Sequence, residues 1–175
     1  NENFVCRGLV ADNGKVYFAG WTLYTGTAYP TTPGAFLTTT TVPSSSNTSV
    51  FSILNTNVAG TAGLEYATYL SYDKPSNVTG MAKDQDGSIW MSIQSSAEGN
   101  FPVTANAVQK GGQLTPTGTP FNAQTTVVTK FSNTGQYLYG SYIAPFWSAT
   151  HGIPALCPAR RRRGRKRLSV SIGGK

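Results

Sequence analysis

The sequence predicts an all-β protein made of two four-stranded antiparallel blades of the kind that build β-propellers. Val, Thr, Tyr and Phe are frequent among its 175 residues while Leu, Met and Glu are sparse, and the chain holds 19 Gly and 10 Pro. This balance favours strands and turns over helices. A sequence pattern that begins at Gly8 also returns from Gly80 onward, and each copy contains four short strand signals. Four antiparallel strands per repeat is the unit of a propeller blade.

The repeat is visible as three blocks that return in the same order, which chance does not readily produce. Each block of the first copy carries the same glycine, proline or aromatic markers as its partner in the second copy. The pairs are 8–19 with 80–92, 29–36 with 101–108, and 63–70 with 135–143. All three pairs keep the spacing that separates Gly8 from Gly80, apart from one residue inserted in a turn of the second copy.

Four strand signals in each copy follow from short runs of β-branched and aromatic residues bounded by Gly, Asn, Asp or Pro. We expect strands at 8–11, 15–19, 49–54 and 64–70 in the first copy, and at 79–83, 88–93, 125–131 and 137–143 in the second. Asp12-Asn13-Gly14 and Asp86-Gly87 supply residues that tolerate positive φ, so they predict hairpin turns between the first two strands.

The remaining parts of each copy have a predicted place as well. Large aromatic side chains fill the space between neighbouring blades, and the segments around Pro30 and Pro102 form an ordered connection between the second and third strands. The polar stretches 38–48 and 111–124 are interpreted as solvated excursions. The aromatic residues assigned to the space between blades are Tyr17, Tyr69, Trp90, Phe131 and Tyr142.

The formal charge of +7 is located in one segment. Residues 1–158 carry six basic and seven acidic side chains, whereas 159–175 carry eight basic side chains and no acidic one. The high isoelectric point therefore belongs to a tail and says nothing about the blades. Burying unpaired arginines costs several kcal/mol each, so we expect this tail to stay exposed and irregular, or loosely helical, without ion pairs to Asp12, Asp84 or Asp86.

A third copy begins at Gly152, at the same spacing from Gly80 as Gly80 has from Gly8, and then fails where the hairpin turn should follow. The chain gives Cys157-Pro158-Ala159 and an arginine run instead, a pattern that a shifted reading frame or a truncation produces. The predicted organisation is the end of a preceding blade strand at 1–7, blade repeats at 8–75 and 76–147, the start of a third repeat at 148–156 and a disordered basic tail at 157–175.

No catalytic, cofactor-binding or metal-binding residues are predicted. His151 is the single histidine, and neither a Gly-x-Ser-x-Gly elbow nor a lysine-containing phosphate loop occurs. Asp84-x-Asp86-Gly87 is similar to the opening of a calcium loop, but the acid that should close the loop is missing, so it is interpreted as a turn. The carboxylates of Glu65, Asp73 and Glu98 are isolated in sequence, which gives no pair for glycoside chemistry.

Three weaker patterns carry little weight. Cys6 and Cys157 are too far apart in sequence to define a disulfide framework, although a bond between them is possible. Asn47-Thr48-Ser49 and Asn77-Val78-Thr79 match the glycosylation acceptor pattern, which arises by chance in such Ser- and Thr-rich sequence. The arginine run attracts phosphate by charge, but no aromatic residues are interleaved with it, so nucleic acid is not an expected partner.

Taken together, the repeat blocks resemble the seven-bladed β-propeller repeat family of bacterial proteins. The matching features are Gly-x-Ala-x-Asp at Gly80, Phe/Tyr-Pro-x-Thr at Tyr29 and Phe101, and Tyr-x-Thr/Ser-Tyr-Leu/Ile before Leu70 and Ile143. The resemblance covers about residues 8–143, and the chain departs from the family pattern after Ile143.

The resemblance implies a non-catalytic scaffold or binding module of a secreted or envelope-associated bacterial protein. Its partners would be neighbouring blades of the parent chain and a protein or carbohydrate ligand held by the loops. The alternative is a piece of a propeller hydrolase or lyase whose active site lies on other blades. The chain shows no signal peptide and no membrane span, because no window approaches 18 consecutive apolar residues.

Overall fold

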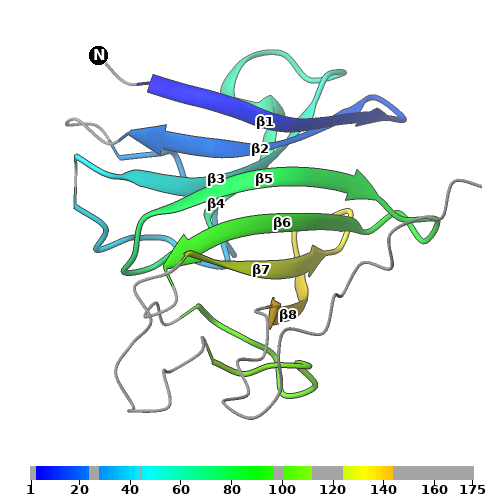
Figure 1. Cartoon of the computed structure of the whole chain (residues 1–175). Coiled ribbons are helices and arrows are strands. Elements are labelled where there is room, and N and C mark those ends of the chain that lie inside the picture. The colour runs from blue at the N-terminus through cyan, green and yellow to red at the C-terminus, as the bar shows by residue number, and fades with distance from the viewer. Residues whose placement is uncertain (1–2, 24–27, 44, 97–100, 112–123, 144–175) are drawn as a thin grey trace, which may run out of the picture.

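The computed structural model describes residues 3–23, 28–43, 45–96, 101–111 and 124–143 (Figure 1). These residues form two four-stranded antiparallel sheets, each with its strands in chain order, and one short 3₁₀ helix, η1 (Gly60–Gly63). The predicted all-β fold is confirmed. Sheet 1 contains β1 (Asn3–Asp12), β2 (Lys15–Leu23), β3 (Asn47–Asn55) and β4 (Leu64–Tyr69); sheet 2 contains β5 (Ser76–Lys83), β6 (Ile89–Ser96), β7 (Gln124–Phe131) and β8 (Tyr137–Ile143).

All eight expected strands are present, but the first strand of each sheet starts earlier than predicted. β1 begins at Asn3, so the prediction that residues 1–7 end a preceding strand is wrong for the described residues 3–7. The pairing of β1 with β2 shifts by one residue between Cys6 and Gly8, and that of β5 with β6 shifts between Val78 and Gly80. Each bulge interrupts the two-residue alternation by which a strand is recognised in a sequence. The sequence therefore predicts that the two strands begin only at or after the bulge.

The predicted hairpin turns are confirmed by their backbone angles. Asn13 and Gly14 have φ of 48° and 74° at the turn from β1 to β2, and Gly87 has φ of 85° at the turn from β5 to β6. Residues with positive φ at a tight turn match the right-handed twist of the strands on either side. The turn chemistry therefore fixes the register of the first strand pair in both sheets.

The two sheets correspond position by position through their pairing. In sheet 1, Tyr17 of β2 pairs with Val10 of β1 and with Ile53 of β3. In sheet 2, Trp90 of β6 pairs with Ala82 of β5 and with Lys130 of β7 in the same way. This correspondence allows each residue of one sheet to be compared with its counterpart in the other.

The sheets stack face to face, with β5 of sheet 2 lying against β1, β2 and β3 of sheet 1. In Figure 1, β5 crosses the middle of the molecule, with β1 and β2 above it and β6 to β8 below. Phe131 is fully buried at the centre of the interface, its ring 5.4 Å from that of Phe51 and 5.7 Å from that of Phe36. Burying side chains of this size contributes about 2 kcal/mol each, so this shared core holds the two sheets together.

The connection between the second and third strands of each sheet is ordered where it is described, as predicted, and it runs along the edge strand β4 or β8. In sheet 1, the amide of Thr32 donates to the carbonyl of Ala67, and the amide of Tyr69 donates to that of Leu37. In sheet 2, equivalent bonds join Thr104 to Gly140 and Tyr142 to Gln109. The outer edges β4 and β8 therefore have their backbone groups partly occupied by ordered chain.

The prediction that 38–48 is a solvated excursion is wrong in part. Val42 and Thr48 are buried, and β3 already begins at Asn47. The amide of Thr41 also donates to the carbonyl of Tyr72 at 2.6 Å, which ties this stretch to the chain leaving β4. Most of the second excursion, 112–123, lies outside the described residues, as do the third repeat at 148–156 and the basic tail.

Candidate functional site

The candidate functional surfaces are two sheet faces against which no other sheet packs among the described residues. Side chains alternate between the two faces of a strand, so the pairing assigns each residue to a face. The covered face of sheet 1, which packs on sheet 2, includes Tyr17, Ala19, Phe51, Ile53 and Tyr66, each at most 5% exposed. The counterparts of these residues form the open face of sheet 2, namely Trp90, Ser92, Val128, Lys130 and Tyr139.

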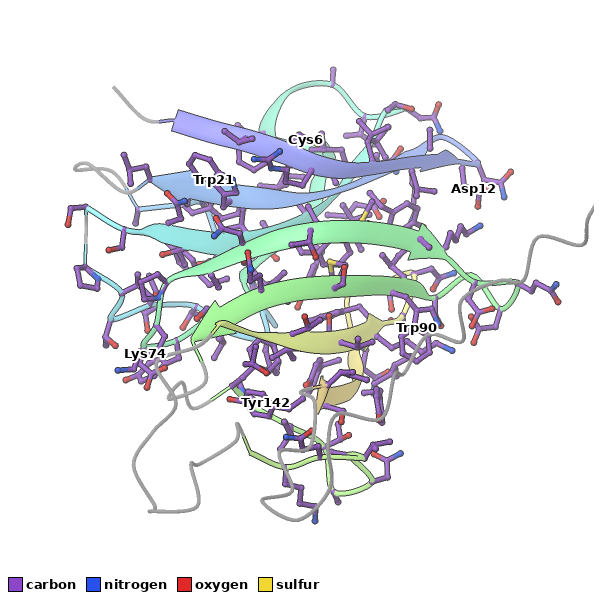
Figure 2. All side chains as sticks on the ribbon, viewed as in Figure 1. Cys6, Asp12, Trp21, Lys74, Trp90 and Tyr142 are labelled. Atoms are coloured by element: carbon purple, nitrogen blue, oxygen red, sulfur yellow. The ribbon has the colours of Figure 1, made fainter. Side chains whose placement is uncertain are left out.

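Trp90 does not lie between the two described sheets, so for this residue the predicted place between neighbouring blades stays a prediction. It lies on the open face of sheet 2, where its indole nitrogen donates to Oδ2 of Asp84 at 3.1 Å. Its ring also contacts that of Tyr139 at 5.9 Å between centroids. Trp90 occupies the position of Tyr17, but no described sheet lies against it (Figure 2).

Tyr69 is also buried away from the interface between the sheets, against the connection segment of sheet 1. Its ring contacts that of Tyr29 at 5.9 Å, and its hydroxyl accepts the amide of Tyr29 at 2.8 Å. Tyr142 makes the equivalent bond with the amide of Phe101 at 3.0 Å but belongs to the core between the sheets. The prediction is confirmed for Tyr17, Phe131 and Tyr142, which all lie in that core.

A cation beside Trp90 connects the open face to the turn between β5 and β6. The ammonium of Lys130 lies 5.1 Å from the centre of the Trp90 ring and pairs with Asp86 at 2.8 Å and Asp84 at 3.3 Å. The hydrogen bond from Lys130 holds the pKa of Asp86 at about 2, and the bond from Trp90 is the main reason why the pKa of Asp84 is also lowered. These carboxylates are therefore hydrogen-bonded to a lysine and to backbone amides of the turn.

The outer face of sheet 1 is the second open surface. Phe4 is 42% exposed and Leu9 is 63% exposed, although both are large apolar side chains. The counterpart of Leu9 in sheet 2 is Met81, which packs against the shared core. The same position is thus covered by the other sheet in sheet 2 and exposed in sheet 1. On the opposite face the order is reversed, because Tyr17 of sheet 1 is covered and Trp90 of sheet 2 is not.

Polar contacts between the sheets add specificity to the stack. Nζ of Lys83 in β5 donates to Oδ2 of Asp12 at 2.5 Å, and the amide of Ser49 donates to the hydroxyl of Ser76 at 3.0 Å. Figure 2 shows Asp12 and Trp90 toward the same end of the sheets. Asp12, Asp84 and Asp86 all have lysine partners within the two sheets, while the arginines predicted to avoid them lie outside the described residues.

Several sequence candidates lie beyond the part of the chain that the structure describes. These are His151, Cys157, Glu98 and the arginine run. Across the described ranges, no three His, Cys, Asp or Glu side chains are grouped closely enough to hold a metal ion. No described helix is long and apolar enough to cross a bilayer.

Comparison with known proteins adds no relative. No protein-family model matches the chain, and no curated protein matches it. The fold and the two open faces are therefore the observations on which a functional interpretation rests.

Proposed function

We propose that the chain is a pair of blades from a non-catalytic β-propeller scaffold or binding module of a secreted or envelope-associated bacterial protein. In this proposal, the two open faces are contact surfaces for neighbouring blades. The stack of two sheets supports the arrangement of blades, and the sequence resemblance supports the family and the location.

One observation carries the proposal: a matched pair of glycines on the covered and open faces. Gly8 of β1 lies so close to Met81 that a Cβ atom there would come within 2.5 Å of the Met81 Cβ. Its counterpart Gly80 borders a hollow of about 310 Å³ on the open face of sheet 2, lined also by Ala82, Trp90 and Val128. The glycine that admits a side chain of the next sheet therefore recurs where the next blade of a propeller would pack.

A head-to-tail stack follows from the same correspondence. The open face of sheet 1 holds Leu9, whose counterpart Met81 lies on the face by which sheet 2 packs on sheet 1. The open face of sheet 2 holds Trp90, whose counterpart Tyr17 lies on the covered face of sheet 1. Contacts of this kind are heterologous, because each unit uses two different surfaces. Blades of a parent chain would use them to close a ring.

The experiment measures association of the full chain by size-exclusion chromatography with light scattering over a range of concentrations. Uncovered blade faces make the chain associate, so we expect Leu9→Glu on one face and Ala82→Glu on the other each to reduce the average mass. Val108→Glu is the matched control, because Val108 is 77% exposed but lies on a connection segment.

Two results would contradict the proposal. One is a chain that stays monomeric at every concentration without binding a hydrophobic dye. The other is association that Val108→Glu reduces as much as the two variants of the faces do. Sequencing of the gene on both sides of this segment tests the parent chain, which should carry further copies of the repeat at the spacing that separates Gly8 from Gly80.

A further inference from the structure

A polar cleft lies at the junction of the two sheets, where Gln94 places it beside the open face of sheet 2. It has a volume of about 400 Å³, within the range of sites for small ligands. Sheet 1 contributes strands β1, β2 and β3 to its walls, and sheet 2 contributes β5 and β6. The lining residues are Arg7, Trp21, Asn47, Asn77, Val78, Thr79 and Gln94.

The β-bulges of β1 and β5 each supply a residue to this cleft. Arg7 is the extra residue of β1 and Thr79 the extra residue of β5, at equivalent points of the repeat. A Cβ atom on Gly20 of β2 would collide with the carbonyl of Val5, so β1 can run this close to β2 only beside a glycine. Bulges redirect side chains and are frequent beside functional sites, and here the two of them converge on one cleft.

The charge of the cleft is positive and uncompensated. None of its lining residues is acidic, and Arg7 forms no ion pair with any residue that the structure describes. By contrast, Asp12, Glu65 and Asp86 are each paired with a lysine elsewhere in the two sheets. A free guanidinium in such a cleft favours a ligand with a carboxylate, which it can bind through two parallel hydrogen bonds.

Side-chain amides, which can hydrogen-bond to hydroxyls, line the same cleft as Arg7. Nδ2 of Asn47 donates to Oδ1 of Asn77 at 3.0 Å, which leaves the Asn77 amino group and the Asn47 carbonyl with hydrogen-bonding capacity. Gln94 adds a third amide beside them. The half-buried indole of Trp21 adds a broad apolar surface, against which the C–H face of a sugar ring can pack.

We propose that this cleft binds an acidic saccharide, with Arg7 holding the carboxylate, the three amides holding hydroxyls and Trp21 packing on the ring. The inference does not depend on the number of blades or on whether the open faces associate with other copies. A chain that fails to associate through its faces can still bind the sugar, and the reverse also holds.

The test uses the full chain and methyl glucuronide as the probe, in buffer with about 150 mM salt to screen weak charge attraction. Binding is followed by tryptophan fluorescence and by isothermal calorimetry, with methyl glucoside as the neutral comparison. We expect saturable binding of the glucuronide, a dissociation constant at least about tenfold weaker in Arg7→Gln, and loss of the fluorescence change in Trp21→Phe.

Two charge controls separate the cleft from other basic groups. Lys110→Gln removes an exposed cation on a connection segment, and Arg163→Gln removes one charge of the basic tail. Both variants should bind the glucuronide like the parent chain. Absence of saturable binding, equal binding of the neutral glucoside, or unchanged binding by Arg7→Gln would overturn the proposal. So would an acidic peptide that binds more tightly than the glucuronide at the same cleft.

Discussion

The covered face of sheet 1 and the open face of sheet 2 share one backbone pattern but differ in chemistry. Ile53 and Ala19 on the covered face are fully buried. Their counterparts on the open face are Lys130 and Ser92, which are partly exposed. Tyr17 and Trp90 are both aromatic, yet only the tyrosine packs in the shared core.

This difference shows that the register of the strands and the polarity of the side chains on each face are determined by different features. Register follows from the hairpin turns and the pairing, which are the same in both sheets. Face chemistry follows from what lies against the face, because a charge is tolerated where it is paired and partly hydrated but not in an apolar core. Exchanging residues between equivalent positions therefore tests the comparison directly.

The largest effect is expected from exchanging Ile53 and Lys130. Ile53→Lys places a charge in the fully buried core and removes apolar packing, so we expect a loss of about 4 kcal/mol or more in the free energy of unfolding. Lys130→Ile removes ion pairs to two exposed carboxylates, and such pairs contribute little, so it should leave the free energy of unfolding nearly unchanged. Urea denaturation measures both, and similar losses in the two variants would show that the faces are equally covered.

A smaller effect is expected from two glycines at turns of sheet 2. Gly135 has φ of 93°, and a Cβ atom there would overlap the ring of Tyr66 on the covered face. Gly87 has φ of 85°, but its nearest neighbour would be 3.6 Å from an added Cβ. We expect Gly135→Ala to cost about 3 kcal/mol and Gly87→Ala about 1 kcal/mol, measured as above. Equal costs would mean that φ alone sets the penalty.

Gly8 on the covered face and Gly80 on the open face form a second pair of glycines that should differ in cost. Gly8→Ala pushes a methyl group into Met81 of the opposite sheet, which should cost about 1 to 2 kcal/mol. Gly80→Ala meets only the hydroxyl of Ser92 at 3.2 Å, so its effect should stay within about 0.5 kcal/mol. Thermal unfolding of the two variants is the measurement. A larger loss for Gly80→Ala would contradict the assignment of the open face.

The smallest effect concerns pH and the pair formed by Lys130 and Asp86. The pKa of Asp86 is about 2 in the folded chain against an ordinary value of 3.8, so the pair stabilises the fold above about pH 4. This contribution is lost as the pH falls from about 4 to about 2. NMR titration of the side-chain carboxyl carbons should show the Asp86 pKa return toward 3.8 in Lys130→Met. An unchanged pKa would assign the shift to the Ser88 amide instead.

The sequence allows the number, order and turn positions of the strands to be predicted, because these depend on local turn residues and on the repeat. It does not show whether an aromatic residue is covered, since Trp90 and Tyr17 stand at the same point of the repeat and only the neighbouring sheet distinguishes them. Lys130 at the position of Ile53 also distinguishes the open face, but strand pairing shows this correspondence, because neither residue lies in the three repeat blocks of the sequence. The cleft at Arg7 depends on two bulges, which a two-residue alternation cannot reveal.

The ordered segments along β4 and β8 determine in which direction these sheets can grow. Free backbone groups on a sheet edge act as templates for strands of other molecules, and this is how cross-β fibres elongate. Here the outer edges already hold chain at Ala67 and Gly140, and the inner edge strands β1 and β5 are interrupted by bulges. Among the described residues, the open faces are therefore better suited to contacts between copies than the edges are, so we expect crowded copies to stack through their faces rather than to pair edge to edge.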